Sequence, residues 1–444
     1  MAMKPIHGIV ILLFDTLRSD FQSINKCSRN NDLSSFKQLQ NFTYPLKQIR
    51  CGSFPTIPMR TDLLTGTLSF LSRRWARPRT NDTIFTNILS EDDIKTFLVT
   101  DNYMMTNEEL GGTFKNFFDE TIEIRGTASD PWKETDSEYK PSNLKLRPTR
   151  NTDFQAQFLS NLKAWNQAGG PPWERLFDKA ADLLMKLCKR KKEKFLLWVD
   201  CFSTHEPWIQ QSDLKNLTPS EPIYPPYGDS RLYTNKQINS LKHQYCNRLS
   251  VVDTALNQFV ESLSQASNSG VATMILSDHG FLLGEYGLVG KPKTPPVLPP
   301  LSDLVCRVSR HFESLLKTRK MLQPCDLTPH ICDLFDVRFP VKTPIQKWPN
   351  RPQLIGRNSP EVTTLSVANQ NGVGFIFRNL LNTEPRWHSW DSLEINKGWQ
   401  EQSYTQVPSQ VKRHKALSSL LKNKAWGSKF TSFLTNDDER VHDD

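Results

Sequence analysis

Three acidic and imidazole side chains directly follow apolar runs in the sequence and are suited to binding a metal ion. Asp15 follows the run at residues 9 to 14, and Asp278 and His279 follow the run at residues 271 to 276. A carboxylate at the end of a buried strand is unfavourable unless it is paired or binds a metal. The adjacent Asp278 and His279 could both face one divalent ion, as an oxygen ligand and an imidazole. For Asp15 alone, a turn or a helix cap is the alternative.

A hydroxyl and a guanidinium are four residues apart in the segment Thr56-Ile57-Pro58-Met59-Arg60. Pro58 suits a first helical turn, so Thr56 is expected just ahead of a helix N-terminus, where free N–H groups favour an anion. Arg60 is one turn further along and can reach the same anion. A hydroxyl placed in this way can act as the nucleophile on a phosphate or sulfate ester. The alternative for Thr56 is an ordinary N-cap.

Two further side chains could contact such an anion or its leaving group. His205 is predicted on the loop after residues 195 to 200, where it could act as a general acid. A hydrogen-bonded loop histidine is the alternative. Lys291 lies in a glycine-rich segment after His279, and it could reach the anion or simply be solvated.

The elements that must position these residues read as alternating strands and helices. Near-continuous apolar runs, each followed by an aspartate, predict strands buried on both faces of a parallel sheet at residues 7–15, 96–99, 195–200 and 271–276. Apolar residues three and four apart predict amphipathic helices over residues 172–187 and 238–259. This order predicts an α/β, doubly wound sheet that binds ligands beyond the carboxyl ends of its strands.

The character of the chain changes near residue 350. Three prolines punctuate a polar stretch, and Asn371-Gly372 lies between two β-like runs, which predicts a hairpin. We therefore expect two units, a catalytic domain at residues 1–348 and a small C-terminal α+β subdomain at residues 349–444. The latter is expected to include antiparallel strands, a basic helical patch around residues 412–424 and an acidic tail.

Composition limits the partners and the compartment. A net charge of +9 over 444 residues is a mild excess that does not indicate a nucleic-acid-binding protein. No apolar window is long enough for a membrane span, and no secretory signal is recognisable, so a cytoplasmic protein is expected. Eight scattered cysteines without a C-x-x-C pair are expected to be free thiols. Nothing in the sequence indicates an oligomeric state.

Four ordered segments resemble the sulfatase family of the alkaline phosphatase superfamily, and the resemblance covers roughly residues 5 to 340. They are residues 14–18 (FDTLR), 55–66 (PTIPMRTDLLTG), 198–208 (WVDCFSTHEPW) and 277–291 (SDHGFLLGEYGLVGK). The resemblance implies an alkaline-phosphatase-like fold, in which a mixed, largely parallel sheet is sandwiched by helices and followed by a small C-terminal antiparallel subdomain.

The resemblance also implies roles for individual residues. It implies that one divalent ion, calcium first and otherwise manganese or zinc, is bound by Asp15, Asp278 and His279, with Thr56 as a further metal-binding residue. It makes Thr56 the nucleophile and Arg60 the residue that steadies it, and it gives His205 and Lys291 contacts to the substrate anion. The implied substrate is a small-molecule or saccharide ester of sulfate or phosphate.

The sequence departs from the family pattern at four places. Sulfatases carry Cys or Ser in a C/S-x-P-S-R motif and convert it to formylglycine, whereas Thr56 could be oxidised only to a ketone. Thr16 stands where many members have a second carboxylate or amide, and residues 101–103 (DNY) stand where a Lys or His is often found. Residues 305–317 are expected to form a basic amphipathic helix where the family has an apolar strand.

These departures leave three functions open. A hydrolase of sulfate or phosphate esters would form a threonine ester that water then cleaves. A phosphodiesterase or phosphonate ester hydrolase could use the same scaffold. A catalytically inactive binding protein that keeps the metal is the alternative from another class. A nucleic-acid-binding role would rest on the basic patches alone.

Overall fold

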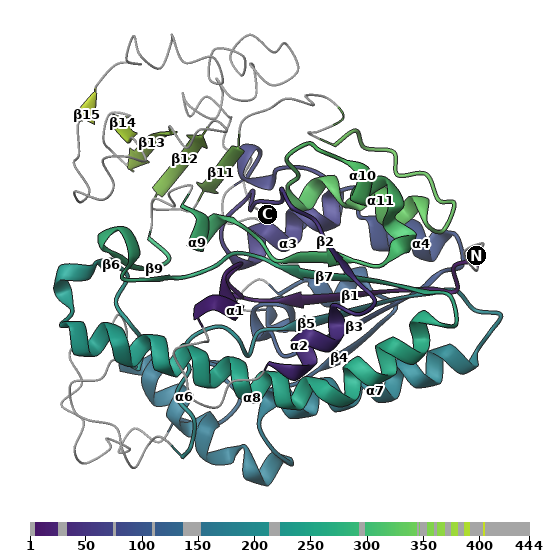
Figure 1. The fold of residues 1–444 in the computed structure, drawn as a ribbon, viewed down its shortest axis with the longest axis horizontal. Helices are drawn as coiled ribbons and strands as arrows, with labels where there is room; N and C mark the ends of the chain where they lie inside the picture. Colours follow the sequence, from purple (N-terminus) through teal and green to yellow (C-terminus); the bar gives the residue numbers. More distant parts are fainter. Residues whose placement is uncertain are drawn as a thin grey trace.

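A seven-stranded sheet, mostly parallel, forms the centre of the computed structural model (Figure 1). The structure describes residues 5–24, 33–73, 77–108, 112–135, 152–212, 223–292, 298–343 and 346, and the strands at 353–358, 362–368, 374–380, 386–390 and 403–404. The sheet order is β2-β10-β7-β1-β5-β3-β4. The strands are β1 (Gly8–Phe14), β2 (Tyr44–Pro45), β3 (Lys95–Thr100), β4 (Glu120–Glu123), β5 (Phe195–Cys201), β7 (Val271–Ser277) and β10 (Cys306–Val308). The four strands predicted from apolar runs are confirmed.

The register of the central strands brings their carboxyl ends level. Strand β1 pairs in parallel with β5 on one side and β7 on the other. Its last residue, Phe14, lies opposite Cys201 and Ser277. Asp15 and Asp278 therefore leave the sheet next to each other, as expected for ligands at the carboxyl ends of parallel strands.

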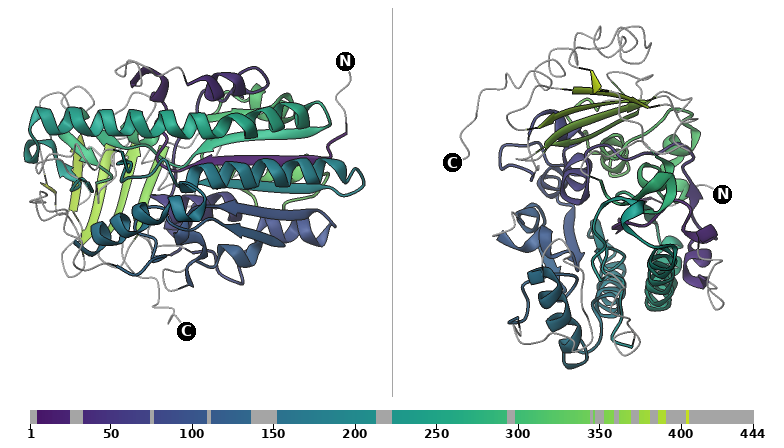
Figure 2. Two further views of the ribbon diagram at one scale, coloured as in Figure 1. Left: turned by 90° about the horizontal axis from the view of Figure 1, so that it is seen from below. Right: turned by 90° about the vertical axis from the view of Figure 1, so that its left-hand side faces the viewer.

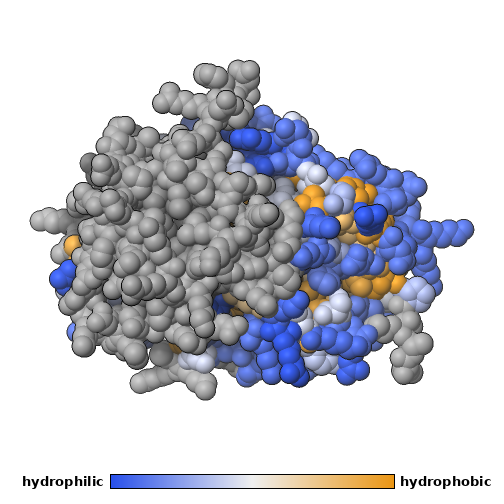
Figure 3. Space-filling view, turned by 90° about the horizontal axis from the view of Figure 1, so that it is seen from above, coloured by the Kyte–Doolittle hydropathy of each residue, from blue (hydrophilic) through white to orange (hydrophobic). Residues whose placement is uncertain are grey.

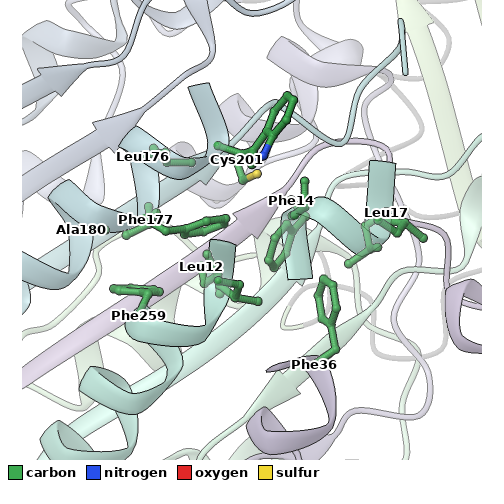
Figure 4. Packing of buried hydrophobic residues seen from close by; sticks show 14 of the residues in the cluster. Leu12, Phe14, Leu17, Phe36, Leu176, Phe177, Ala180, Cys201 and Phe259 are labelled. Carbon is green, nitrogen blue, oxygen red and sulfur yellow. The ribbon is translucent and has the colours of Figure 1, made fainter. Parts of the chain in front are cut away.

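Helices cover both faces of this sheet, because its central strands are apolar on both sides. The side chains of β1 alternate between two cores, with Ile9, Ile11 and Leu13 in one and Val10, Leu12 and Phe14 in the other. Helices α7 (Pro172–Lys189) and α8 (Asn235–Ser267) run side by side over the second core (Figure 2). Figure 4 shows Phe177 of α7 and Phe259 of α8 beside Leu12. Both predicted amphipathic helices are confirmed.

The remaining elements are short. The helices are α1 (Phe21–Ile24), α2 (Ser34–Leu39), α3 (Thr56–Thr65), α4 (Phe85–Glu91), α5 (Tyr103–Thr106), α6 (Thr152–Ala164), α9 (Pro299–Ser302), α10 (Glu313–Lys317) and α11 (Thr328–Asp333). The 3-10 turns are η2 (Ser69–Leu71), η4 (Phe114–Phe117), η5 (Asn166–Ala168), η7 (Ser230–Leu232), η8 (Glu285–Gly287), η9 (Arg310–Phe312) and η10 (Pro324–Asp326). A three-stranded sheet combines β6 (Gly228–Asp229), β8 (Leu282–Leu283) and β9 (Leu288–Gly290).

A second, antiparallel sheet of five strands follows in the C-terminal part. Its strands are β11 (Gln353–Asn358), β12 (Val362–Ala368), β13 (Gly374–Leu380), β14 (Arg386–Trp390) and β15 (Ser403–Tyr404). Strands β12 and β13 pair as the predicted hairpin requires, while the turn at Asn371-Gly372, the basic patch at 412–424 and the acidic tail lie outside the described residues. The division of the chain at residue 348 stays a prediction.

Strand β11 of this five-stranded sheet is hydrogen-bonded to the chain segment that precedes α3. Gly356 donates its N–H to the Gly52 carbonyl at 3.2 Å and accepts from the Phe54 N–H at 2.8 Å. The Gln323 amide also donates to the Leu354 carbonyl at 2.7 Å. The five-stranded sheet is therefore hydrogen-bonded to the backbone just ahead of Thr56.

One sequence expectation is wrong. Residues 305–317, expected to form a basic amphipathic helix, contain the strand β10, which pairs antiparallel with β7, followed by η9 and α10. Cys306 and Val308 are buried and Arg307 is partly exposed, which is the alternation of a strand. The pairing with β7 overrides the local helical pattern.

The surface of the described residues is mainly hydrophilic, as expected when the apolar side chains are buried on the two faces of the main sheet. On the face in Figure 3 the described residues are mainly hydrophilic, with smaller hydrophobic areas between them. Within the described part of the chain no helix is long and apolar enough to cross a membrane. The seven cysteines in that part are free thiols, as expected.

Candidate active site

Asp15, Asp278 and His279 meet at the carboxyl edge of the main sheet. Each contributes one possible ligand atom, these atoms lie within 4.8 Å of one another, and all three side chains are buried. Asp15 Oδ2 and His279 Nε2 have no hydrogen-bond partner. His279 Nδ1 lies 2.9 Å from the Gly280 carbonyl, which can only accept, so Nδ1 carries the proton and Nε2 keeps its lone pair. This is the usual orientation of a metal-binding histidine, and the residues fit a divalent ion.

The electrostatics of these three groups also suit a cation. Burial and the neighbouring Asp15 carboxylate raise the pKa of Asp278. Burial lowers the pKa of His279 to about 3, so its imidazole is neutral at pH 7. Burial alone would raise the pKa of Asp15, but His205, Arg60 and other cationic groups outweigh it and lower that pKa. A dication between the two carboxylates would offset their repulsion.

Arg60 lies among these carboxylates instead of projecting into solvent. Its Nε and one terminal nitrogen donate to the two oxygens of Asp200 at 2.8 and 2.9 Å. The other terminal nitrogen donates to Asp278 Oδ2 at 2.8 Å and lies 3.4 Å from Asp15 Oδ2. The guanidinium therefore neutralises part of the charge of the ligand set. Its predicted contact with a substrate anion remains a prediction.

Thr56 is the first residue of α3, one position later than the N-cap expected from the sequence. It is buried, with 2% of its surface exposed, and its carbonyl accepts a hydrogen bond from Arg60 at 3.0 Å. The loop before it is held by Asp62, whose carboxylate accepts from the N–H and the hydroxyl of Ser53 at 2.8 and 2.7 Å. Arg60 thus links the start of α3 directly to the candidate metal ligands.

His205 and Lys291 lie together on two loops beside this cluster. Lys291 Nζ is 2.6 Å from His205 Nε2, and His205 Nδ1 is 2.5 Å from the Glu206 carbonyl. Because that carbonyl only accepts, Nδ1 carries the imidazole proton and Nε2 accepts from Lys291. Burial lowers the pKa of His205, although the Glu206 carboxylate opposes this shift. Lys291 helps to lower the pKa of Asp15, so its ammonium group lies within electrostatic reach of that carboxylate.

Thr16 takes a supporting position where many family members have a second carboxylate or amide. With a positive φ of 59°, it donates its N–H to Asp278 Oδ1 at 2.8 Å and its hydroxyl to Asp15 Oδ1 at 2.6 Å. These bonds hold the two carboxylates and leave Asp15 Oδ2 without a hydrogen bond, 3.4 Å from the Arg60 guanidinium.

Two residues of this site received no role from the sequence. Asp200 is the second-last residue of strand β5, and an aspartate directly follows each of the strands β1, β3 and β7, so this position was the available signal. Glu206 follows His205 in the quoted segment, and its oxygens lie 3.0 and 3.1 Å from Lys291 Nζ. No local pattern indicates either partner, because Arg60 and Lys291 come from distant segments.

Comparison with known proteins agrees with this fold. Solved structures of the same fold include a candidate sulfatase from Bacteroides fragilis (12% identity, 98% of each chain covered, TM-score 0.62). They also include a phosphonate monoester hydrolase from Agrobacterium radiobacter (10% identity, 98% of this chain and 96% of that one, TM-score 0.58). A 2-O GAG sulfatase matches at 11% identity over 97% of this chain and 94% of its own, with a TM-score of 0.56. No curated protein matches the chain.

The architecture is that of the alkaline phosphatase superfamily, a mixed and mostly parallel sheet between helices with a small antiparallel sheet, as expected from the sequence. The Sulfatase family matches residues 7–337. The chain belongs to the sulfatase family.

Proposed function

We propose that this sulfatase-family protein is a metal-dependent hydrolase of sulfate or phosphate esters with Thr56 as its nucleophile. The observation that supports this most strongly is the meeting of two buried ligand atoms that make no hydrogen bond, Asp15 Oδ2 and His279 Nε2, beside an arginine that donates to the Thr56 carbonyl. Ligand atoms held in this way suit a cation that would polarise the ester and acidify the hydroxyl.

The kinds of ligand atom that Asp15, Asp278 and His279 offer favour some metal ions over others. Calcium, the ion that the family resemblance puts first, takes six to eight oxygen ligands. The three residues here offer one imidazole nitrogen and carboxylate oxygens, a combination better suited to zinc or manganese. We propose zinc or manganese as the resident ion, with calcium as the alternative.

The proposed reaction has two steps. In the first, the Thr56 oxygen bonds to sulfur or phosphorus while the bond to the leaving-group oxygen breaks. The Thr56 proton passes to solvent, and the leaving alkoxide takes a proton from the protein. In the second, water attacks the threonine ester, the bond to Thr56 breaks, and sulfate or phosphate is released with the hydroxyl restored. The sum is ester plus water giving alcohol plus acid.

Lys291 and His205 are proposed to deliver the proton to the leaving group. In the structure the Lys291 ammonium group donates a hydrogen bond to His205 Nε2. Proton transfer from Lys291 to His205, or directly from Lys291, would make the departing alcohol neutral. The role proposed for His205 from the sequence therefore depends on Lys291.

Both sulfate and phosphate chemistry are compatible with the scaffold. Proteins of the same fold are named as a 2-O GAG sulfatase and as a phosphonate monoester hydrolase. Another is named as a complex with a neocarrahexaose, which supports a saccharide ester as one substrate class to test here.

A substrate panel tests the proposal. Purified protein would be assayed with an aryl sulfate, an aryl phosphate, a phosphodiester and a phosphonate monoester, each with added zinc, manganese or calcium. Thr56→Ala should lower kcat by about a thousandfold or more. Thr254→Ala, at an exposed threonine of α8, should leave it unchanged. Bound metal with no hydrolysis of any ester would instead support the inactive binding protein.

A further inference from the structure

The two cations nearest the candidate metal ligands are each paired with a carboxylate outside that ligand set. Arg60 holds both oxygens of Asp200. Lys291 Nζ lies 3.0 Å from Glu206 Oε1 and 3.1 Å from Glu206 Oε2. Neither cation therefore adds a full positive charge to the site. Asp15 and Asp278 would balance a divalent ion in the same way.

Glu206 is built into the site as a buried anion. It is 0% exposed, and the Tyr227 hydroxyl donates a hydrogen bond to it. Burial alone would raise its pKa, but His205, Lys291 and the Tyr227 hydrogen bond outweigh burial and lower the pKa. The side chain is thus a carboxylate at neutral pH, and its partner Lys291 is also buried. Repulsion of a further negative charge is strong in such a setting, because little water screens it.

We propose that Glu206 sets the charge selectivity of the site, so that singly charged esters, such as sulfate monoesters and phosphodiesters, are preferred over doubly charged phosphate monoesters. This inference rests on the proposed function. The second negative charge of a phosphate monoester would meet a lysine that Glu206 has already neutralised. Glu206 is therefore a specificity-determining residue.

The test compares two substrates that differ by one charge. An aryl sulfate carries one negative charge, and the matching aryl phosphate carries two at about pH 8, since its second pKa is about 6. Glu206→Gln keeps the shape and a hydrogen-bond acceptor for Lys291 but removes the charge. We expect it to shift the ratio of kcat/KM values at least about tenfold toward the phosphate. Glu313→Gln, at an exposed residue of α10 paired with Lys317, should leave the ratio unchanged.

Binding gives a readout that does not depend on turnover. Methyl sulfate and methyl phosphate would be titrated calorimetrically into the Thr56→Ala protein and into the Thr56→Ala/Glu206→Gln protein. Glu206→Gln should lower the Kd of methyl phosphate by a factor about tenfold larger than its effect on the Kd of methyl sulfate.

The wild-type protein provides the test if Glu206→Gln does not fold. Its kcat/KM for the phosphate, divided by that for the sulfate, should fall as pH rises through about 6, where the phosphate gains its second charge. Protein titrations affect both substrates and cancel in the ratio. A ratio that stays constant or rises would contradict the inference.

The two proposals fail in different ways. If the wild-type protein hydrolyses none of the esters in the substrate panel, the proposed function is wrong. If it hydrolyses them and Glu206→Gln leaves the ratio within twofold of the wild type, the ester hydrolase stands and Glu206 does not set its selectivity.

Discussion

Both carboxylate oxygens of Asp200 accept hydrogen bonds from one guanidinium, that of Arg60, at 2.8 and 2.9 Å. Both side chains are fully buried. Arg60 belongs to α3 and Asp200 to β5, so the pair fixes the helix that begins with Thr56 against the centre of the sheet. Such a pair offsets the loss of hydration only while both partners are present.

Breaking this pair should destabilise the protein. Arg60→Lys, whose ammonium cannot hold both oxygens, and Asp200→Asn should each lower the free energy of unfolding by about 3–5 kcal/mol. Urea unfolding at pH 7 measures the change. Arg319→Lys is a control, since Arg319 is exposed and should change stability by less than about 0.5 kcal/mol. A similarly small effect of Asp200→Asn would show that the pair is dispensable.

Removing His279 should abolish metal binding. After dialysis the wild-type protein is expected to retain about one divalent ion per chain, and His279→Ala should lose most of it, because three protein ligands become two. Elemental analysis measures the content, and added zinc or manganese should raise the Tm of the wild type but not of the variant. His243→Ala, at an exposed histidine of α8, is the matched control. Equal metal content in His279→Ala and wild type would contradict the assigned ligand.

Asp101 should make stability depend on pH. Burial raises its pKa from 3.8 to about 7, so the folded protein keeps a proton that the unfolded chain loses between these values. In that pH window the unfolded chain binds fewer protons than the folded protein, so unfolding releases a proton. The free energy of unfolding therefore falls as pH rises through the window. Asp101→Asn does not titrate, so its stability relative to wild type should increase from about pH 4 to 7, by up to about 4 kcal/mol, and then level off.

Unfolding measured across this pH range checks the prediction. Asp182→Asn, at an exposed residue of α7, should run parallel to the wild type. The hydrogen bonds of Asp101 to the Phe202 N–H and the Ser203 hydroxyl position the loop that carries His205. A difference between Asp101→Asn and wild type that does not vary with pH would mean that the carboxyl group is already ionised at pH 4.

Gly356 should tolerate no side chain. A Cβ at this position would lie 2.0 Å from the ring of the buried Phe70, and hydrogen bonds to Gly52 and Phe54 limit any backbone shift. Gly356→Ala should cost about 1–3 kcal/mol of stability and reduce activity through the segment before Thr56. Thermal unfolding and kcat measure these effects. The double variant with Phe70→Leu should recover part of the loss, and an unchanged Gly356→Ala protein would contradict the tight contact.

The sequence predicted the parts of the fold that local patterns determine. Strands β1, β3, β5 and β7 are continuous apolar runs because both their faces are buried, and that pattern does not depend on distant residues. Since their carboxyl ends share one edge, the proximity of Asp15, Asp278 and His279 could also be predicted.

The pairings between distant segments could not be predicted in this way. Arg60 and Asp200 are buried together because each neutralises the other, but neither residue type indicates its partner. The same holds for Lys291 and Glu206. Strand β10 was missed because its three residues are too few to show an alternating pattern, and its identity depends on the neighbouring edge of β7.

The position of β1 in the sheet has a consequence for synthesis of the chain. This strand, at residues 8 to 14, is synthesised before both of its hydrogen-bonding neighbours, residues 195–201 and 271–277. Until the second neighbour emerges, one edge of an entirely apolar strand has no partner, which is the situation that promotes aggregation. Nascent chains that stop short of residue 271 should therefore depend on chaperones, and the candidate metal ligands can assemble only after translation has passed His279.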